Sequence, residues 1–134
     1  MKKKKVVICA SASFEKEIVE WKNKLESLGY DVIKYPEKIG EDNFLEDYKL
    51  VHVNHYNSIV NSNMILALNL EKKGITGYIG AGVFAEIAFA IGLNKTLNKN
   101  IEVCYLNTIP NEVLPYSDEL KLWQDLGWIK QFKA

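Results

Sequence analysis

The sequence lacks an excess of charge of either sign. Its 17 basic and 17 acidic residues leave a formal net charge of zero at pH 7, so no broad electrostatic surface is available for DNA, RNA or an anionic membrane. No apolar stretch approaches the roughly 18 residues needed to span a bilayer. The apolar run after the N-terminal lysines is also too short for a signal peptide. We therefore expect a soluble, cytoplasmic protein with no nucleic-acid or membrane partner.

Cysteine is equally scarce. Cys9 and Cys104 are the two cysteines, and each lies inside an apolar run, without the spacing of a disulfide framework or a metal site. We expect two buried thiols and no metal. A chain of 134 residues buries roughly two thirds of its unfolded surface without such supports. With no internal repeat, residues 1–134 are expected to form one domain.

Strand-like and helix-like patterns alternate along the chain. Short apolar runs predict strands at 5–10, 30–35, 64–69 and 101–106, with a short edge strand within 127–132. Helical periodicity predicts helices at 14–28, 44–59, 83–93 and 117–125. Ser13 is expected to cap the first helix and Gly29 to end it, and a break near Asn54 is left open in the second. The alternation predicts an α/β fold with a doubly wound parallel sheet, a flavodoxin-like three-layer sandwich.

Ligands of such folds bind outside the carboxyl ends of the strands. Ser11, Ser13 and Asn107 follow strands at that edge, and the glycines of 74–82 lie in a connection longer than the usual ~2 to 6 residues. Gly80 and Gly82 begin a G-x-G-x-x-A match. A dinucleotide-binding fingerprint directly follows the first strand, and this match does not. Its position therefore disfavours an NAD-type redox enzyme. The glycines still predict a helix N-terminus whose free amides could hold a phosphate or carboxylate.

Glu86 is the one acid in the apolar stretch "GYIGAGVFAEIAFAIGLNK". On the predicted helix it lies between the small residues Gly82 and Ala90, beside an apolar stripe. An unpaired buried carboxylate costs several kcal/mol. Two interpretations stay open: a helix acid that is partly exposed or bonded to neighbouring amides, and a carboxylate in the ligand crevice that serves as nucleophile or base.

Four segments together resemble a known family: "ICASASF", "HYNSIVNSNMILALN", the stretch around Glu86, and "YLNTIP". They are similar to the nucleoside 2-deoxyribosyltransferases and to relatives that hydrolyse the N-glycosidic bond of nucleotides. The resemblance extends from about residue 5 to about residue 120. Its most specific part is the glycine loop followed by a Glu in a helix of small residues.

The resemblance implies a function. Glu86 would attack C1′ of the sugar, and the covalent glycosyl-enzyme would pass to an acceptor base or to water. The ligand would be a nucleoside or a nucleoside 5′-monophosphate, with no cofactor, in a homo-oligomer for which Tyr116 and Trp123 are candidate contacts. The residues expected to bind substrate are Ser11, Ser13 and Phe14 in the first loop, Tyr78, Gly80 and Gly82 in the glycine loop, and Asn69 and Asn107 at strand ends. As strand-end residues, the two asparagines could equally be ordinary turn residues.

The sequence departs from the transferase pattern at two acids. His55 and Gly80 stand where transferases of the family have aspartates. His55 could act as a hydrogen-bond donor or general acid, or be an ordinary helix histidine; His52 is expected to have no role in the site. The predicted function is cleavage or transfer at an N-glycosidic bond. The alternative is a non-catalytic module that senses a nucleotide.

Overall fold

A five-stranded parallel sheet forms the centre of the protein, with the strand order β2-β1-β3-β4-β5. The computed structural model describes residues 2–111 and 113–134. The strands are β1 (Lys5–Cys9), β2 (Asp31–Lys34), β3 (Met64–Ala67), β4 (Glu102–Tyr105) and β5 (Lys130–Gln131). This order is that of flavodoxin-like doubly wound folds, in which the order reverses between β1 and β3. The predicted fold class is confirmed.

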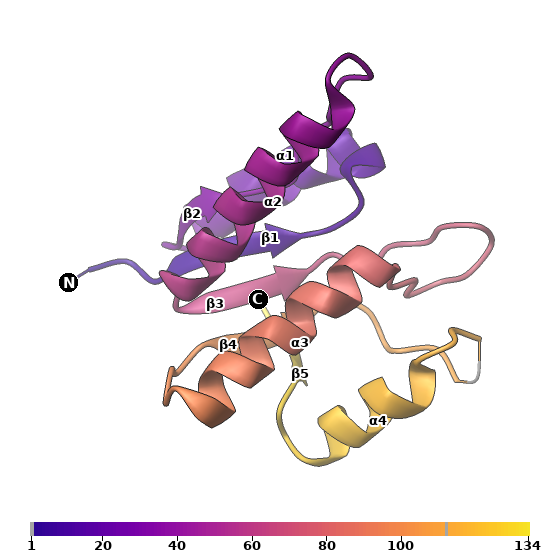
Figure 1. The fold of residues 1–134 in the computed structure, drawn as a ribbon. Helices are drawn as coiled ribbons and strands as arrows, with labels where there is room; N and C mark the ends of the chain where they lie inside the picture. Colours follow the sequence, from indigo (N-terminus) through magenta and orange to yellow (C-terminus); the bar gives the residue numbers. More distant parts are fainter. Residues whose placement is uncertain (1, 112) are drawn as a thin grey trace.

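Helices cover both faces of the sheet (Figure 1). Helix α1 (Glu15–Ser27), preceded by the short 3-10 helix η1 (Ala12–Phe14), covers one face. Helices α2 (Phe44–Val60), α3 (Ala81–Thr96) and α4 (Ser117–Asp125) cover the other. In the described part of the chain, no helix combines the length and the apolar character needed to cross a membrane.

The core has two halves, separated by the sheet. Val7 and Ile65 are buried against α2 and α3, whereas their neighbours Val6 and Leu66 are buried against α1. Successive residues of a strand point to opposite faces. Strands covered on both faces must therefore be apolar throughout, which is why "VVIC" and "MILA" were recognisable as strands.

The structure changes one local prediction and decides one alternative that the sequence left open. Ser13 does not cap α1. The turn η1 intervenes, and the side chain of Ser11 accepts a hydrogen bond from the Ser13 amide at 3.4 Å. Helix α2 continues unbroken past Asn54 because His55 and Ile59 on its inner face are buried, and packing outweighs the modest helix propensity of Asn. Gly29 does end α1 in a left-handed conformation, with a φ of 97°.

The long connection between β3 and α3 begins with a tight turn. The backbones of Lys72 and Ile75 exchange two hydrogen bonds, of 3.1 and 2.9 Å. The two residues between them, Lys73 and Gly74, have φ values of 55° and 75°. Positive φ at both central positions is the geometry of a two-residue hairpin turn. The connection is thus a folded structure of its own.

Asn69 joins this connection to the loop after β4. Its side chain is 1% exposed. The Oδ1 atom accepts hydrogen bonds from the amides of Leu106 (2.9 Å) and Asn107 (2.8 Å), and Nδ2 donates to the carbonyls of Asn107 (2.6 Å) and Gly77 (3.4 Å). Gly77 itself has a φ of 78°, and a Cβ there would overlap the carbonyl oxygen of Thr108. The two loops are therefore packed backbone to backbone.

Candidate functional site

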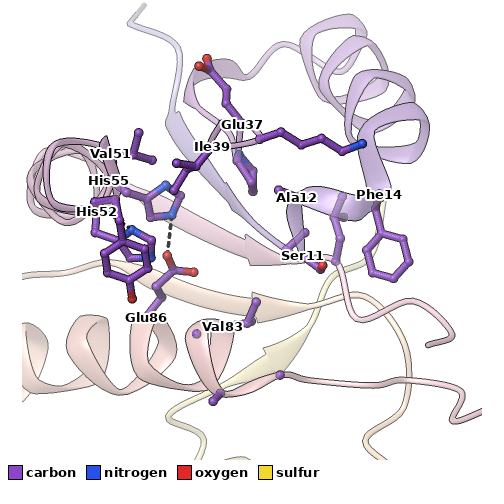
Figure 2. Close-up of a pocket in the computed structure, with 18 of the residues that line it drawn as sticks. Ser11, Ala12, Phe14, Glu37, Ile39, Val51, His52, His55, Val83 and Glu86 are labelled. Atoms are coloured by element: carbon purple, nitrogen blue, oxygen red, sulfur yellow. Dashed lines mark hydrogen bonds and ion pairs between the residues drawn. The ribbon is translucent and has the colours of Figure 1, made fainter. Parts of the chain in front are cut away.

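A cavity of about 550 Å³ opens at the carboxyl end of the sheet. The loops after β1, β2 and β3 line it, together with α2 and the start of α3 (Figure 2). Strands β1 and β3 end side by side beneath it, with Cys9 paired to Ala67. This is the point at which the strand order reverses, where doubly wound folds bind their ligands.

Glu86 lies on the wall of this cavity and faces His55 across it (Figure 2). Its Oε2 atom is 3.1 Å from Nε2 of His55, and the two side chains are only 12% and 6% exposed. The Sγ atom of Cys9 is 3.6 Å from the same Nε2. Glu86 is therefore a largely buried acid whose polar neighbours are the side chains of His55 and Cys9, which favours the interpretation as a carboxylate in the ligand crevice.

The packing of α2 against α3 brings this pair together. Ile59, one turn after His55 on α2, and Ile87, beside Glu86 on α3, are both buried in the same core. Each polar side chain thus sits at the cavity end of an apolar helix face. Cys9, at the end of β1, is fully buried and closes the cluster from the sheet side. We call Cys9, His55 and Glu86 the buried triad.

Burial shifts the pKa of each member of the buried triad. Burial raises the pKa of Glu86 from 4.5 to about 7, although a hydrogen bond from Cys9 opposes this. Burial, reinforced by the charges of Lys34 and His52, lowers the pKa of His55 from 6.5 to about 4. Burial, followed by the charge of Glu86, raises the pKa of Cys9 well above its usual value. Burial thus favours the neutral form of both groups, and the 3.1 Å contact is a hydrogen bond between the imidazole and the carboxyl group.

The direction of that hydrogen bond depends on pH. Between about pH 4 and pH 7 both groups are neutral, and the carboxyl O–H of Glu86 donates to Nε2. Above pH 7 the carboxylate of Glu86 accepts from Nε2–H, with the imidazole proton on that nitrogen. His55 thus acts as a hydrogen-bond donor once Glu86 is ionised. The lowered pKa disfavours the other predicted role, that of a general acid.

The loop after β1 supplies a second polar group at the cavity. Ser11 lines the cavity, and its Oγ is 2.8 Å from Oγ of Ser13. Lys72, from the connection after β3, donates to Ser11 Oγ at 2.9 Å and also lines the cavity. Phe14 lines the same side, whereas Ser13 is exposed and lies just outside. We call Ser11, Ser13 and Lys72 the serine–lysine cluster.

Lys72 was missed in the sequence because no basic residue lies in the first loop itself. Its signal was its position in the unusually long connection after β3, the strand next to β1. The sequence contains no arginine, so no guanidinium group is available to bind an anion, and Lys72 offers an ammonium group in its place. The start of α3, where Gly80 and Gly82 line the cavity, adds the free amides of a helix N-terminus.

Helix α2 contributes an aromatic wall that the sequence did not reveal. Tyr48 and His52 stack with ring centroids 3.7 Å apart, and Phe44 packs on Tyr48 at 5.8 Å. All three line the cavity, as does Tyr78 from the glycine loop. His52, expected to have no role, is therefore part of the cavity. Its spacing of four residues from Tyr48 on one helix was the available signal.

Two pairs of predicted residues lie elsewhere. Asn69 and Asn107 bond to each other and to the backbone, and they are not among the residues that line the cavity. Their predicted part in substrate binding is not supported, and their geometry is that of strand-end turn residues. Tyr116 and Trp123, the candidate oligomer contacts, both stack on Phe84 of the same chain, at 4.3 and 5.1 Å.

The cavity therefore combines a buried carboxylate held by a neutral imidazole, an aromatic wall, and a lysine with hydroxyls on another side. Comparison of the sequence with models of known protein families gives no match, and comparison with curated proteins also gives none.

Proposed function

We propose that this protein binds a nucleoside or nucleoside 5′-monophosphate and cleaves, or transfers at, its N-glycosidic bond. The observation that carries the proposal is Glu86, a nearly buried carboxylate on the wall of a cavity at the switch point of the sheet, with His55 as its hydrogen-bond donor. The resemblance of the glycine loop and its glutamate to the nucleoside 2-deoxyribosyltransferases supports the same reaction.

In the proposed reaction the ionised carboxylate of Glu86 attacks C1′ of the sugar. The bond from C1′ to the base nitrogen breaks, and the base leaves with the electron pair and takes up a proton from solvent water. Water or another base then attacks C1′ of the resulting glycosyl ester, the bond from C1′ to Glu86 breaks, and the attacking group gives up its proton to solvent. With a pKa of about 7, Glu86 is about half ionised at neutral pH and is a capable leaving group in the second step. The Nε2–H of His55 holds it in place.

The opposite parts of the cavity orient the substrate. The serine–lysine cluster provides a cation and hydroxyls for a 5′-phosphate or a sugar hydroxyl, and its hydrogen bonds to phosphate would be charge-assisted. The stacked rings of Tyr48 and His52 offer an apolar face on which a base can lie. Gly82, at which a Cβ would meet no other atom, leaves room for the sugar beside Glu86.

Base release from a panel of ribo- and deoxyribonucleosides and their 5′-monophosphates tests the proposal. We expect the wild type to release base, with kcat/KM rising as pH increases through about 7. The variant Glu86→Gln should lose this activity. The matched control is Glu119→Gln, at an exposed position in α4, which should retain it. Mass spectrometry of the quenched wild type should show a glycosyl adduct that is absent from Glu86→Gln. Equal release by the wild type and Glu86→Gln would refute the proposal.

One observation favours a second candidate, a nucleotide sensor without turnover. Among the described residues that line the cavity, only Glu37 and Glu86 are acids, and the carboxylate of Glu37 points away from Glu86 (Figure 2). No second carboxylate is therefore placed to protonate a leaving base. A sensor would show saturable, ligand-induced thermal stabilisation in both the wild type and Glu86→Gln, with no base released by either.

A further inference from the structure

The buried triad brings together three different ligand atoms of the kind that transition metals prefer. A thiol sulfur, an imidazole nitrogen and a carboxylate oxygen all lie within 4.8 Å of one another. The Sγ–Nε2 distance is 3.6 Å and the Nε2–Oε2 distance is 3.1 Å. A tetrahedral Zn²⁺, with bonds of ~2.0 Å to nitrogen and ~2.3 Å to sulfur, places its ligand atoms roughly 3.3 to 3.6 Å apart. The side chains need to move only slightly to reach that geometry.

The chemistry of the three ligands discriminates between cations. Sulfur and imidazole ligands suit Zn²⁺ and neighbouring transition metals, whereas Mg²⁺ and Ca²⁺ require oxygen ligands. A thiolate and a carboxylate together carry two negative charges, which neutralise a dication. Neutrality matters here because both Cys9 and His55 are buried, and an uncompensated buried charge is costly.

The scaffold and the access route also suit a metal. Cys9 ends a strand, and His55 and Glu86 lie within helices, so the three side chains project from regular elements that hold their directions. His55 and Glu86 line the cavity, while Cys9 lies behind them. A bound ion would therefore have three protein ligands and a fourth position that faces the cavity, as in open zinc sites.

We propose that Cys9, His55 and Glu86 form a binding site for one Zn²⁺ ion. On binding, the thiol of Cys9 releases its proton to water and binds the ion as thiolate, and the neutral imidazole of His55 binds through Nε2 with its own proton on Nδ1. The same carboxylate cannot ligate Zn²⁺ and attack a sugar, so the ion and the proposed glycosyl ester exclude one another; only this consequence rests on the proposed function.

Cobalt substitution tests the site without reference to any activity. The full chain, free of a histidine tag and treated with chelator, is titrated with Co²⁺ and then with Zn²⁺. We expect a thiolate-to-cobalt charge-transfer band in the near ultraviolet that saturates at one Co²⁺ per chain and disappears on displacement by Zn²⁺. Removal of a ligand should weaken binding at least roughly tenfold.

Each ligand has a control of the same residue type. The band should be lost in Cys9→Ser and kept in Cys104→Ser, which changes the other buried cysteine. Zn²⁺ affinity should fall in His55→Gln and remain in His52→Gln. If Cys9→Ser does not fold, Glu86→Gln tests the site instead. This variant is expected to fold because the carboxylate lies at the cavity wall and not in the sealed core.

Three results would overturn the proposal: no thiolate band in the folded wild type, a band that moves with Cys104, or unchanged Zn²⁺ affinity in Glu86→Gln. Base release is measured separately. If the protein binds Zn²⁺ but releases no base, the zinc site is supported and the proposed function is refuted. If it releases base but does not bind Zn²⁺, the proposed function is supported and the zinc site is refuted.

Discussion

The opposite pKa changes of Glu86 and His55 should cancel in the pH dependence of stability. Glu86 has a pKa raised from 4.5 to about 7. Its stabilising contribution to the free energy of unfolding is therefore fully present below pH 4.5 and is lost as pH rises through 7. His55 has a pKa lowered from 6.5 to about 4, so its contribution is fully present above pH 6.5 and is lost as pH falls through 4. From about pH 4.5 to 6.5 the folded pair and the unfolded pair each bind one proton. Because proton binding is equal, the pair does not make the free energy of unfolding vary with pH in that range.

Single substitutions should reveal the two opposing pH dependences of the free energy of unfolding. At 1.36 kcal/mol for each unit of pKa, either change alone is worth about 3 kcal/mol. In His55→Gln only Glu86 remains. Relative to the wild type, its free energy of unfolding should therefore fall by about 2 to 3 kcal/mol as pH rises from 4.5 to 7. In Glu86→Gln it should rise by about the same amount from pH 4 to 6.5.

Urea unfolding at a series of pH values, followed by tryptophan fluorescence and circular dichroism, measures these differences. The other titrating groups are common to all the proteins, so subtraction from the wild type removes their effect. Glu119→Gln, an exposed substitution, should give a difference that does not vary with pH. Slopes of the opposite sign would mean that Glu86 and His55 form a charged ion pair. Flat differences for both variants would mean that neither group is buried as described.

Three further predictions concern the loops and the cavity. Gly77→Ala should destabilise the protein by about 2 kcal/mol more than Gly74→Ala in urea unfolding: both residues have positive φ, but only at Gly77 would a Cβ meet the Thr108 carbonyl. Equal losses would refute that close approach. Asn69→Ala should cost about 2 kcal/mol in the same assay because it leaves the part-buried amide of Asn107 without its acceptor, whereas the Leu106 amide keeps the carbonyl of Ala67 at 3.1 Å; a loss under about 1 kcal/mol would show that the Asn107 amide finds another partner. Lys72→Met should weaken binding of a nucleoside 5′-monophosphate at least about tenfold in calorimetry and leave the nucleoside unaffected. A similar loss for both ligands would show that the serine–lysine cluster does not bind the phosphate.

Regular elements were predictable where their signal is local. Helix α4 has the predicted bounds, Ser117–Asp125, because its apolar periodicity is complete within its own residues. The strands were found because burial on both faces requires short, continuous apolar runs. Ser13 was assigned the wrong role because a serine can cap whichever helical turn follows it, and the intervening turn η1 is not marked in the sequence.

The carboxylate Glu86 and the glycine loop were identified as candidates from the sequence alone. Their partners were only partly identified. His55 was a candidate, but Cys9 was expected to be an inert buried thiol, and Lys72 and the Tyr48–His52 stack were not expected at the cavity. The apparent role of Asn69 also changed, from ligand binding to joining two loops.

The sequence by itself determined the α/β architecture, the edge of the sheet at which a cavity forms, and the unusual acid in an apolar helix. These follow from hydrophobic periodicity and from the rule that parallel strands end at one edge. The tertiary structure alone decided which side chains meet there. Cys9, His55 and Glu86 come from β1, α2 and α3, and Lys72 reaches Ser11 from another loop. Their distances and pKa values depend on how helices pack and how deeply each group is buried, which no local pattern records.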